Sequence, residues 1–251
     1  MQDQNRKYKA YLTIFAQILN KVEAAIVRDY HELSVLQQSR NEPVNFSNKT
    51  IDRAVNRILS DLENYYPDAG LVINGQVFQK EGKKDAGYIL IEILSESLVF
   101  MRAFPYFVLS LTYAKKQGEE YDLLATQINL PFFTESLQAI SGDKAYFGQN
   151  IVLRIPQNTE ESINMIVAVD SEFQTDKVKI FKQVSLLSLT YELTLLAEGK
   201  IDFLCRKYEY YEQIAGLSLI LQNAGFFLEI DQKAKIIKAA NHKSKSLYDT
   251  V

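Results

Sequence analysis

Apolar residues recur at helical spacing in two segments near the start of the chain. The first segment contains Leu12, Phe15, Ala16, Ile18, Leu19, Val22, Ala25 and Ile26, and the second contains Ile51, Ala54, Val55, Ile58, Leu62 and Tyr66. Residues three and four positions apart fall on one face of a helix. The pattern therefore predicts two amphipathic helices, the second ending at the Pro67-Asp68 stop.

Short apolar runs dominate the middle of the chain. Turn signals such as Asn-Gly and Lys-Lys-Gln-Gly separate these runs, which cover residues 70–73, 88–93, 107–114, 123–130 and 164–169. Runs of this length between turn residues indicate strands. After Thr175, helical spacing returns in two segments that begin near Val184 and Ile214, and a last strand and a closing helix follow.

This order of elements predicts an α+β fold of layered helices and sheets. With 47% hydrophobic and 24% charged residues, the chain can bury a sizeable core. No internal repeat or long linker divides its 251 residues. We therefore expect a single domain over residues 1–251, with an N-terminal lobe of about 1–155 and a C-terminal lobe of about 156–251.

The charge and cysteine content exclude several classes of protein. A formal charge of −3 leaves no basic surface of the kind that binds nucleic acid directly. The single cysteine, Cys205, excludes an internal disulfide and a thiolate metal cluster, and it suits a reducing compartment. The N-terminal segment is periodic, which predicts neither a secretory signal nor a membrane span. We expect a cytoplasmic protein.

One block resembles a known metal site. The run from Tyr88 to Pro105 has an apolar strand, a polar turn and a closing Phe-Pro pair. It resembles the block of the inositol monophosphatase family that reads strand, Asp-Pro-Ile/Leu-Asp-Gly-Thr and then Phe-Pro. Without a gap, Glu92 matches the first aspartate of that block, Ser95 the second, Glu96 the glycine and Ser97 the threonine.

Other stretches resemble the same family in the same order along the chain. They are residues 131–146, which resemble a hairpin block, then Leu196-Ala-Glu-Gly-Lys-Ile-Asp202, Tyr211-Glu-Gln-Ile-Ala-Gly216 and Ile236-Ile-Lys-Ala-Ala-Asn241. The resemblance implies an alternating α-β-α-β-α sandwich. It also implies a Mg²⁺-dependent phosphomonoesterase that commonly forms homodimers, for which the segment from Phe100 to Leu111 could supply an apolar interface.

The matched metal positions are altered. The family takes its carboxylate ligands from a Gly-Glu-Glu block, from both aspartates of the central block and from a Trp-Asp pair. In this chain, Asn74 and Gly75 match the two glutamates, and Glu212 matches the aspartate of the Trp-Asp pair. Gly75 and Ser95 carry no carboxylate, while Glu92 and Glu212 are longer than aspartate by one methylene. That methylene moves the carboxylate by roughly 1.5 Å, and Mg²⁺ tolerates misplaced ligands poorly. The resemblance therefore implies that Mg²⁺ is bound, whereas the residues at the matched ligand positions make this binding doubtful.

Further candidates complete the predicted site. Asp52 begins an Asp-Arg-Ala run that resembles one in the family, which makes it a catalytic candidate, and Ser97 could hold a phosphate oxygen or a metal as the family threonine does. Glu96 could replace the carboxylate lost at Ser95. On the substrate side, Arg206 stands where the family glutamate binds inositol hydroxyls, and its charge favours an anionic substrate; Ser188 is a further substrate-binding candidate.

Each of these residues also has a purely structural interpretation. Glu92 follows an apolar strand, where a glutamate is often a solvated boundary residue. Ser97 is placed as a helix N-cap would be. Glu96 would be a solvated turn residue, and Arg206 one of a pair of solvated cations with Lys207.

Three functions remain open from the sequence. The first is a degenerate family member that has lost phosphatase activity and acts as a binding or scaffold protein. The second is a re-tooled Mg²⁺-dependent phosphatase that acts on a phosphorylated small molecule, such as inositol phosphate or a nucleotide bisphosphate. The third, which rests on the bacterial branch of the family, is a protein partner of the transcription antitermination machinery.

Overall fold

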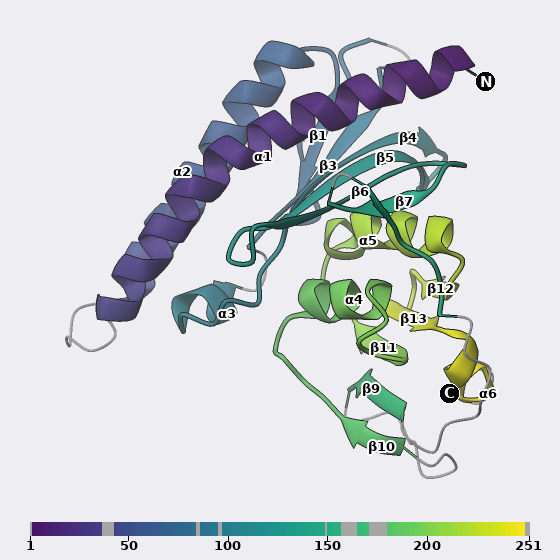
Figure 1. Ribbon diagram of the computed structural model, residues 1–251. Coiled ribbons are helices and arrows are strands. Elements are labelled where there is room, and N and C mark those ends of the chain that lie inside the picture. Colours follow the sequence, from purple (N-terminus) through teal and green to yellow (C-terminus); the bar gives the residue numbers. More distant parts are fainter. Residues whose placement is uncertain are drawn as a thin grey trace.

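Two β-sheets alternate with layers of helices in the computed structural model (Figure 1). The structure describes residues 2–36, 43–83, 86–94, 97–148, 150–156, 165–170 and 180–248. The helices are α1 (Gln2–Leu36), α2 (Pro43–Tyr65), α3 (Ser97–Met101), α4 (Leu189–Ala197), α5 (Tyr211–Ala224) and α6 (Lys245–Tyr248). The predicted α+β layered architecture is confirmed.

The larger sheet has eight strands in the order β2-β1-β3-β4-β5-β6-β7-β8. They are β1 (Gly70–Ile73), β2 (Gln76–Gln79), β3 (Tyr88–Ile93), β4 (Leu109–Gln117), β5 (Glu120–Leu130), β6 (Glu135–Ile140), β7 (Ala145–Phe147) and β8 (Ile151–Val152). Strands β1 and β3 are parallel, and the other neighbours in this sheet are antiparallel.

The smaller sheet has five strands in the order β10-β9-β11-β13-β12. They are β9 (Met165–Val169), β10 (Ile180–Gln183), β11 (Phe203–Lys207), β12 (Phe227–Asp231) and β13 (Ile236–Ala240). The two sheets fall on either side of the predicted lobe boundary, although α5 packs against both. Whether the lobes form a single folding unit stays a prediction.

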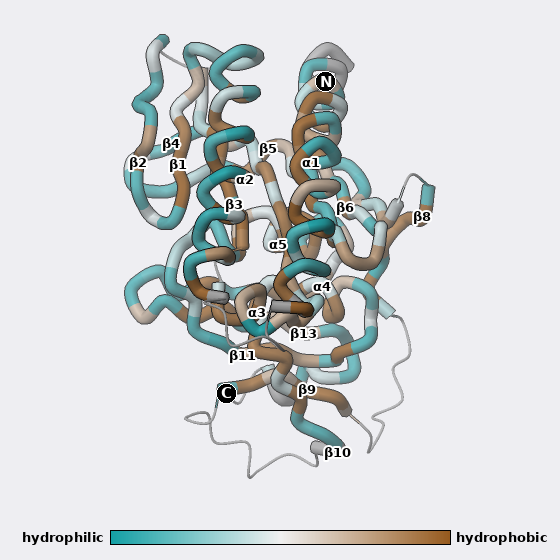
Figure 2. Tube along the Cα trace, turned by 90° about the vertical axis from the view of Figure 1, so that its left-hand side faces the viewer, coloured by the Kyte–Doolittle hydropathy of each residue, from teal (hydrophilic) through white to brown (hydrophobic). Residues whose placement is uncertain are grey.

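Helix α1 covers the larger sheet with one apolar face. Hydrophobic and hydrophilic residues alternate along it (Figure 2), and its buried side chains include Phe15, Ile18, Leu19, Val22 and Ile26. By length and composition alone, Lys7–Leu33 could cross a membrane. In this fold its apolar face packs against α2 and β5. The predicted absence of a membrane span stays a prediction.

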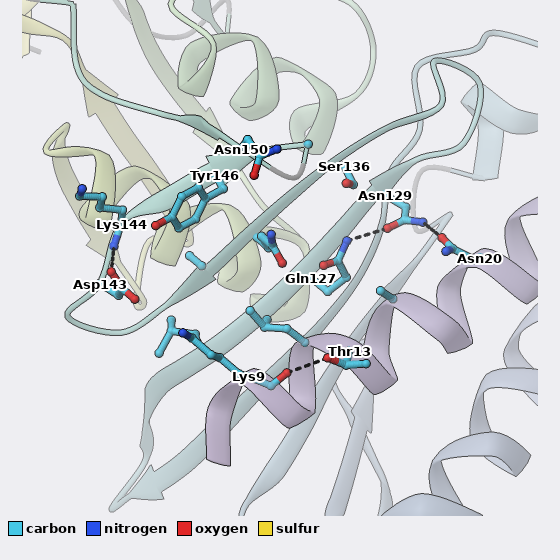
Figure 3. A pocket seen from close by; sticks show the side chains of 16 residues that line it. Lys9, Thr13, Asn20, Gln127, Asn129, Ser136, Asp143, Lys144, Tyr146 and Asn150 are labelled. Carbon is cyan, nitrogen blue, oxygen red and sulfur yellow. Dashed lines mark hydrogen bonds between the residues drawn. The ribbon is translucent and has the colours of Figure 1, made fainter. Parts of the chain in front are cut away.

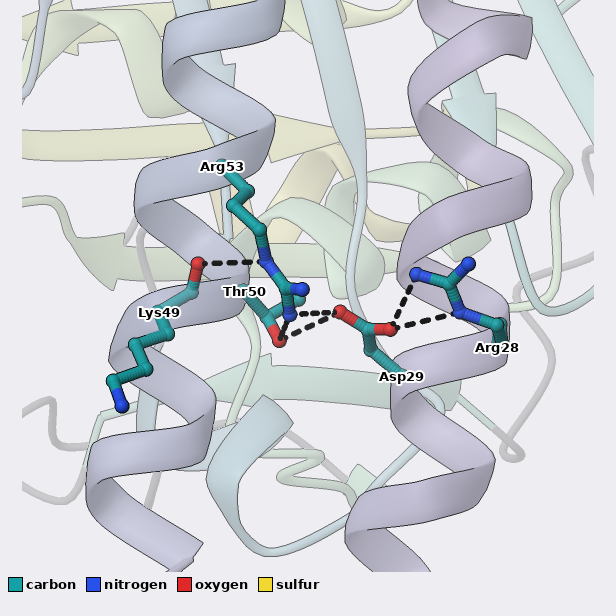
Figure 4. A network of polar contacts seen from close by, with 5 residues as sticks. All are labelled: Arg28, Asp29, Lys49, Thr50 and Arg53. Carbon is teal, nitrogen blue, oxygen red and sulfur yellow. Dashed lines mark hydrogen bonds and ion pairs between the residues drawn. The ribbon is translucent and has the colours of Figure 1, made fainter.

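A buried carboxylate joins α1 to α2 (Figure 4). Asp29 is 3% exposed, and its Oδ2 accepts hydrogen bonds from Thr50 Oγ1 at 2.9 Å and Arg53 Nη2 at 2.7 Å. Arg28 donates to the other oxygen, Oδ1. Because a buried charge requires such partners, this network fixes how the two helices pair.

Helices α4 and α5 form the layer between the sheets. Helix α5 lies close to β5 because Gly216 has no side chain: a Cβ there would lie 2.7 Å from Thr126 Oγ1 and 3.0 Å from Thr112 Oγ1. The smaller sheet buries Cys205, and burial raises the pKa of its thiol to about 11. This agrees with a packing role for the cysteine.

Several sequence predictions in the second half of the chain are wrong. The helix expected from near Val184 begins at Leu189, because Ser188 is the N-cap and Leu187 has a φ of 62°. Strand β11 was not predicted, and two strands, β12 and β13, stand where one was expected. The expected closing helix, by contrast, is present as a 3-10 turn followed by α6.

Candidate functional site

Glu92 lies inside the protein. It occupies β3 opposite Ser110 of β4, and it is 2% exposed. Side chains alternate between the faces of a strand, and Leu90, two residues earlier, belongs to the core around α4 and α5. Glu92 therefore faces the layer that contains α5, and its interpretation as a solvated strand-end residue is wrong.

Gly75 belongs to a tight hairpin turn. Asn74 and Gly75 are the two residues between β1 and β2, with φ angles of 51° and 72°. Positive φ at both positions is typical of a type I′ turn, for which Asn-Gly is a favoured pair. The two positions matched to the family glutamates therefore close a hairpin.

An aromatic ring covers this turn. A Cβ at Gly75 would lie 2.7 Å from Cδ1 and 3.3 Å from Cε1 of Tyr210. The ring thus fills the space into which a side chain at position 75 would begin to extend. Tyr210 directly precedes α5, and Gln213 Oε1 accepts hydrogen bonds from the backbone N–H groups of Glu209 and Tyr210.

Glu212 reaches the same turn from the first turn of α5. Its Oε2 accepts a hydrogen bond from the Gly75 backbone N–H at 3.1 Å, and the residue is 4% exposed. Burial raises the pKa of this carboxyl, while hydrogen bonds from its own N–H and from that of Gly75 oppose the rise. The structure thus brings together two of the matched positions, Gly75 and Glu212.

Two residues of the matching sequence blocks, Asp202 and Asn241, connect three strands of the smaller sheet. Asp202 Oδ2 accepts from the Ile166 N–H at 2.9 Å, and Asp202 Oδ1 accepts from Asn241 Nδ2 at 2.8 Å. Ser244 Oγ donates to the Asp202 carbonyl. The contacts connect β9, the start of β11 and the end of β13, so the matching blocks around Asp202 and Asn241 meet in space.

Solved structures with the same architecture are inositol monophosphatases and related suppressor proteins. An extragenic suppressor protein suhB from Bartonella henselae superposes with a TM-score of 0.78 over 96% of this chain and 97% of its own, at 18% identity. The chain has the inositol monophosphatase fold. A Thermotoga maritima inositol monophosphatase gives 0.73 over 98% and 96%, at 15% identity, and Mycobacterium tuberculosis SuhB gives 0.72 over 98% and 95%, at 12% identity.

The similarity to these proteins is found by comparing structures and is not found by comparing whole sequences. No family model matches the chain, and no curated protein matches it. At these identities the inositol monophosphatase fold is established, whereas activity and partners have to be argued from the site.

Arg206 is engaged by two acidic residues. Its Nε lies 2.7 Å from Asp170 Oδ1, and its Nη1 lies 2.5 Å from Glu192 Oε2. Glu192 is fully buried, and burial raises the pKa of its carboxyl, which hydrogen bonds from the Leu186 N–H and Arg206 oppose. The interpretation of Arg206 as a solvated cation is wrong, since its side chain is 14% exposed. Its predicted role toward an anionic substrate stays a prediction.

The remaining predicted residues are dispersed. Ser188 is buried as the N-cap of α4 and accepts from the Tyr191 N–H at 3.2 Å. Asp52 is exposed in the middle of α2. Ser97 is the first residue of α3, with an exposed side chain. Ser95 and Glu96 lie outside the described residues.

The described residues do not fit a magnesium site. They contain no group of three or more His, Cys, Asp or Glu side chains that could hold a metal ion. Mg²⁺ requires near-octahedral oxygen coordination, and its sites use carboxylates. Of the matched positions within the described chain, Glu92 and Glu212 carry a carboxylate, Glu212 is hydrogen-bonded to the Gly75 turn, and Gly75 supplies none.

Sequence reasoning missed the role of Tyr210. The tyrosines at positions 208, 210 and 211 indicated stacking or helix packing, and no pattern linked them to a turn more than a hundred residues earlier. With Tyr121, they line a pocket of about 460 Å³ beside that turn. The sequence feature that could have indicated this contact was the loss of a glutamate at Gly75 together with the aromatic run before α5.

Proposed function

We propose that this protein is an inositol-monophosphatase-fold protein that has lost Mg²⁺-dependent phosphatase activity and acts by binding. One observation carries the proposal: the Asn74-Gly75 turn stands where the family has its two glutamates. Tyr210 covers this turn, and Glu212 is hydrogen-bonded to it. A side chain that reached the site from position 75 would have to displace the ring.

The charge at the site supports the same conclusion. Metal-dependent phosphoryl transfer depends on cations that neutralise the developing charge and activate the nucleophile. The buried acids Glu92 and Glu212 are the matched carboxylates that the described chain retains. Together they supply a formal charge of −2, which is too little to hold two or three divalent ions against their hydration.

Phosphate release from inositol monophosphate and from adenosine bisphosphate, measured with Mg²⁺ and with Mn²⁺, tests this proposal. We expect no release above the level of Glu92→Gln and Glu212→Gln variants purified in parallel. Release that persists in both variants would come from a contaminating phosphatase. Release that the parent shows and both variants lose would overturn the proposal.

A re-tooled phosphatase is the second candidate, and one observation favours it. Glu92 and Glu212 are both at least nine-tenths buried; Glu92 faces the helical layer from β3, and Glu212 belongs to α5 in that layer. Carboxylate oxygens are ligands of Mg²⁺, so a re-tooled site would use these two acids as its ligands. The same release assay decides between the two candidates.

The partners are proposals as well. Half of the segment expected to form a dimer interface is buried within the monomer, including Phe100, Phe107 and Leu109. Phe104 and the neighbouring Leu98 are 42% and 54% exposed and could still contact a second copy. Light scattering on the parent and on Leu98→Glu would show whether a dimer depends on this surface. Partnership with antitermination factors stays a prediction.

A further inference from the structure

A polar groove lies on the other face of the larger sheet, away from Glu92. It has a volume of about 660 Å³ and runs between α1 and strands β5, β6 and β7 (Figure 3). This volume falls within the range of small-molecule sites, about 300–1,000 Å³. Helix α1 presents one stripe of residues to it, from Lys9 through Thr13 and Ala16 to Asn20.

Two buried carboxamides line the groove. Gln127 and Asn129 are 4% and 3% exposed, and they stand on the sheet face where β4 and the start of β5 carry apolar residues such as Leu111 and Ala125. Burying an amide costs free energy unless its polar atoms are hydrogen-bonded. The partners of each amide therefore decide whether it is explained by packing alone.

The two amides form a chain of hydrogen bonds that ends at Gln127 Oε1, an acceptor to which no described residue donates. Asn129 Nδ2 donates to Asn20 Oδ1 at 2.9 Å and to Glu23 Oε2 at 2.7 Å. Asn129 Oδ1 in turn accepts from Gln127 Nε2 at 3.0 Å. This contact fixes the orientation of the Gln127 amide, and no described residue donates to Gln127 Oε1.

More polar side chains continue the site across the sheet. Gln127 lies opposite Gln138 on β6, and Gln138 lies opposite Tyr146 on β7. Asn129 lies opposite Ser136 in the next row. Neighbouring strands are about 4.8 Å apart, so these rows form a grid of amide, hydroxyl and phenol groups on one face.

We propose that this groove binds a neutral carbohydrate. Carboxamides and hydroxyls both donate and accept hydrogen bonds, as sugar hydroxyls do. The Tyr146 ring offers an apolar surface for the C–H face of a sugar. The charged residues of the lining are Lys9, Asp143 and Lys144, with a formal sum of +1, which is little for a polyanion. The site is independent of the proposed function, because it uses the opposite face of the sheet.

Calorimetric titration of the full-length protein with maltose, sucrose and trehalose tests this site. We expect saturable binding of at least one disaccharide, with a Kd of roughly millimolar or tighter. Gln127→Met and Gln138→Met should each weaken it about tenfold, which corresponds to the loss of one hydrogen bond. Gln17→Met is the matched control, because Gln17 is exposed on α1 and outside the lining.

The outcomes separate clearly. Circular dichroism of each variant first confirms that it is folded, and Gln138, which is only half-buried, guards against a misfolded Gln127 variant. No binding of any disaccharide up to roughly tens of millimolar would overturn the proposal. Binding that both groove variants leave unchanged, or preferential binding of adenosine monophosphate, would overturn it as well.

Discussion

Replacing Gly75 by alanine measures how closely Tyr210 covers the hairpin turn. Gly75 has a φ of +72°, and a Cβ there would lie 2.7 Å from Tyr210 Cδ1. A left-handed backbone costs an L-residue about 1–2 kcal/mol, and turning the ring away from its rotamer costs about 0.5–1.5 kcal/mol more. We therefore expect Gly75→Ala to lower the free energy of unfolding by about 2–3 kcal/mol.

Gly118 provides the matched control. It also has a positive φ, +66°, but a Cβ there would meet no described atom within 4 Å. Gly118→Ala should therefore cost only the left-handed backbone, about 1–2 kcal/mol. Urea denaturation followed by circular dichroism measures both losses, and in a Tyr210→Ala background the two should become equal. Equal losses in the parent background would refute the account of a covered turn.

Three further variants test other parts of the structure. Asn241→Ala should lower the free energy of unfolding by about 1–3 kcal/mol, because buried Asp202 Oδ1 loses its donor; an unchanged thermal melt would count against this connection. Glu212→Gln should stabilise the protein at neutral pH and not at low pH. Burial raises the pKa of the Glu212 carboxyl in the folded state, so its ionisation costs stability as the pH rises from the unfolded pKa through the raised folded one; parallel pH–stability curves for parent and variant would contradict this. Asp29→Ala should cost about 1–3 kcal/mol, whereas Arg28→Ala, whose side chain is 69% exposed, should cost less than about 1 kcal/mol; equal losses on urea denaturation would show that the network in Figure 4 is not organised around the carboxylate.

The first half of the fold could be predicted because its patterns are local. The helical spacing before Pro67 and the runs at 70–73 and 88–93 correspond to α1, α2, β1 and β3. Strand β11 could not be predicted, because Phe203-Leu-Cys205 is a short apolar run that periodicity alone cannot distinguish from buried helix. The start of α4 depended on the cap at Ser188, which the apolar pattern does not mark.

The site could be located from the sequence only in part. Matching motifs placed Gly75 and Glu212 at one site, and the structure joins them by a hydrogen bond. The Tyr210 ring over the turn and the acidic partners of Arg206 depend on contacts between distant segments. Matching motifs one residue at a time does not predict contacts between distant segments.

Calorimetric titration of Mn²⁺ and Mg²⁺ into the purified protein tests the central claim most directly. If the turn at Gly75 and the Tyr210 ring have replaced the metal site, the account predicts no saturable heat at metal concentrations up to roughly millimolar. The traces of Glu92→Gln and Glu212→Gln should then match that of the parent. Saturable binding by the parent that both variants lose would contradict the account and show that the two buried glutamates hold an ion.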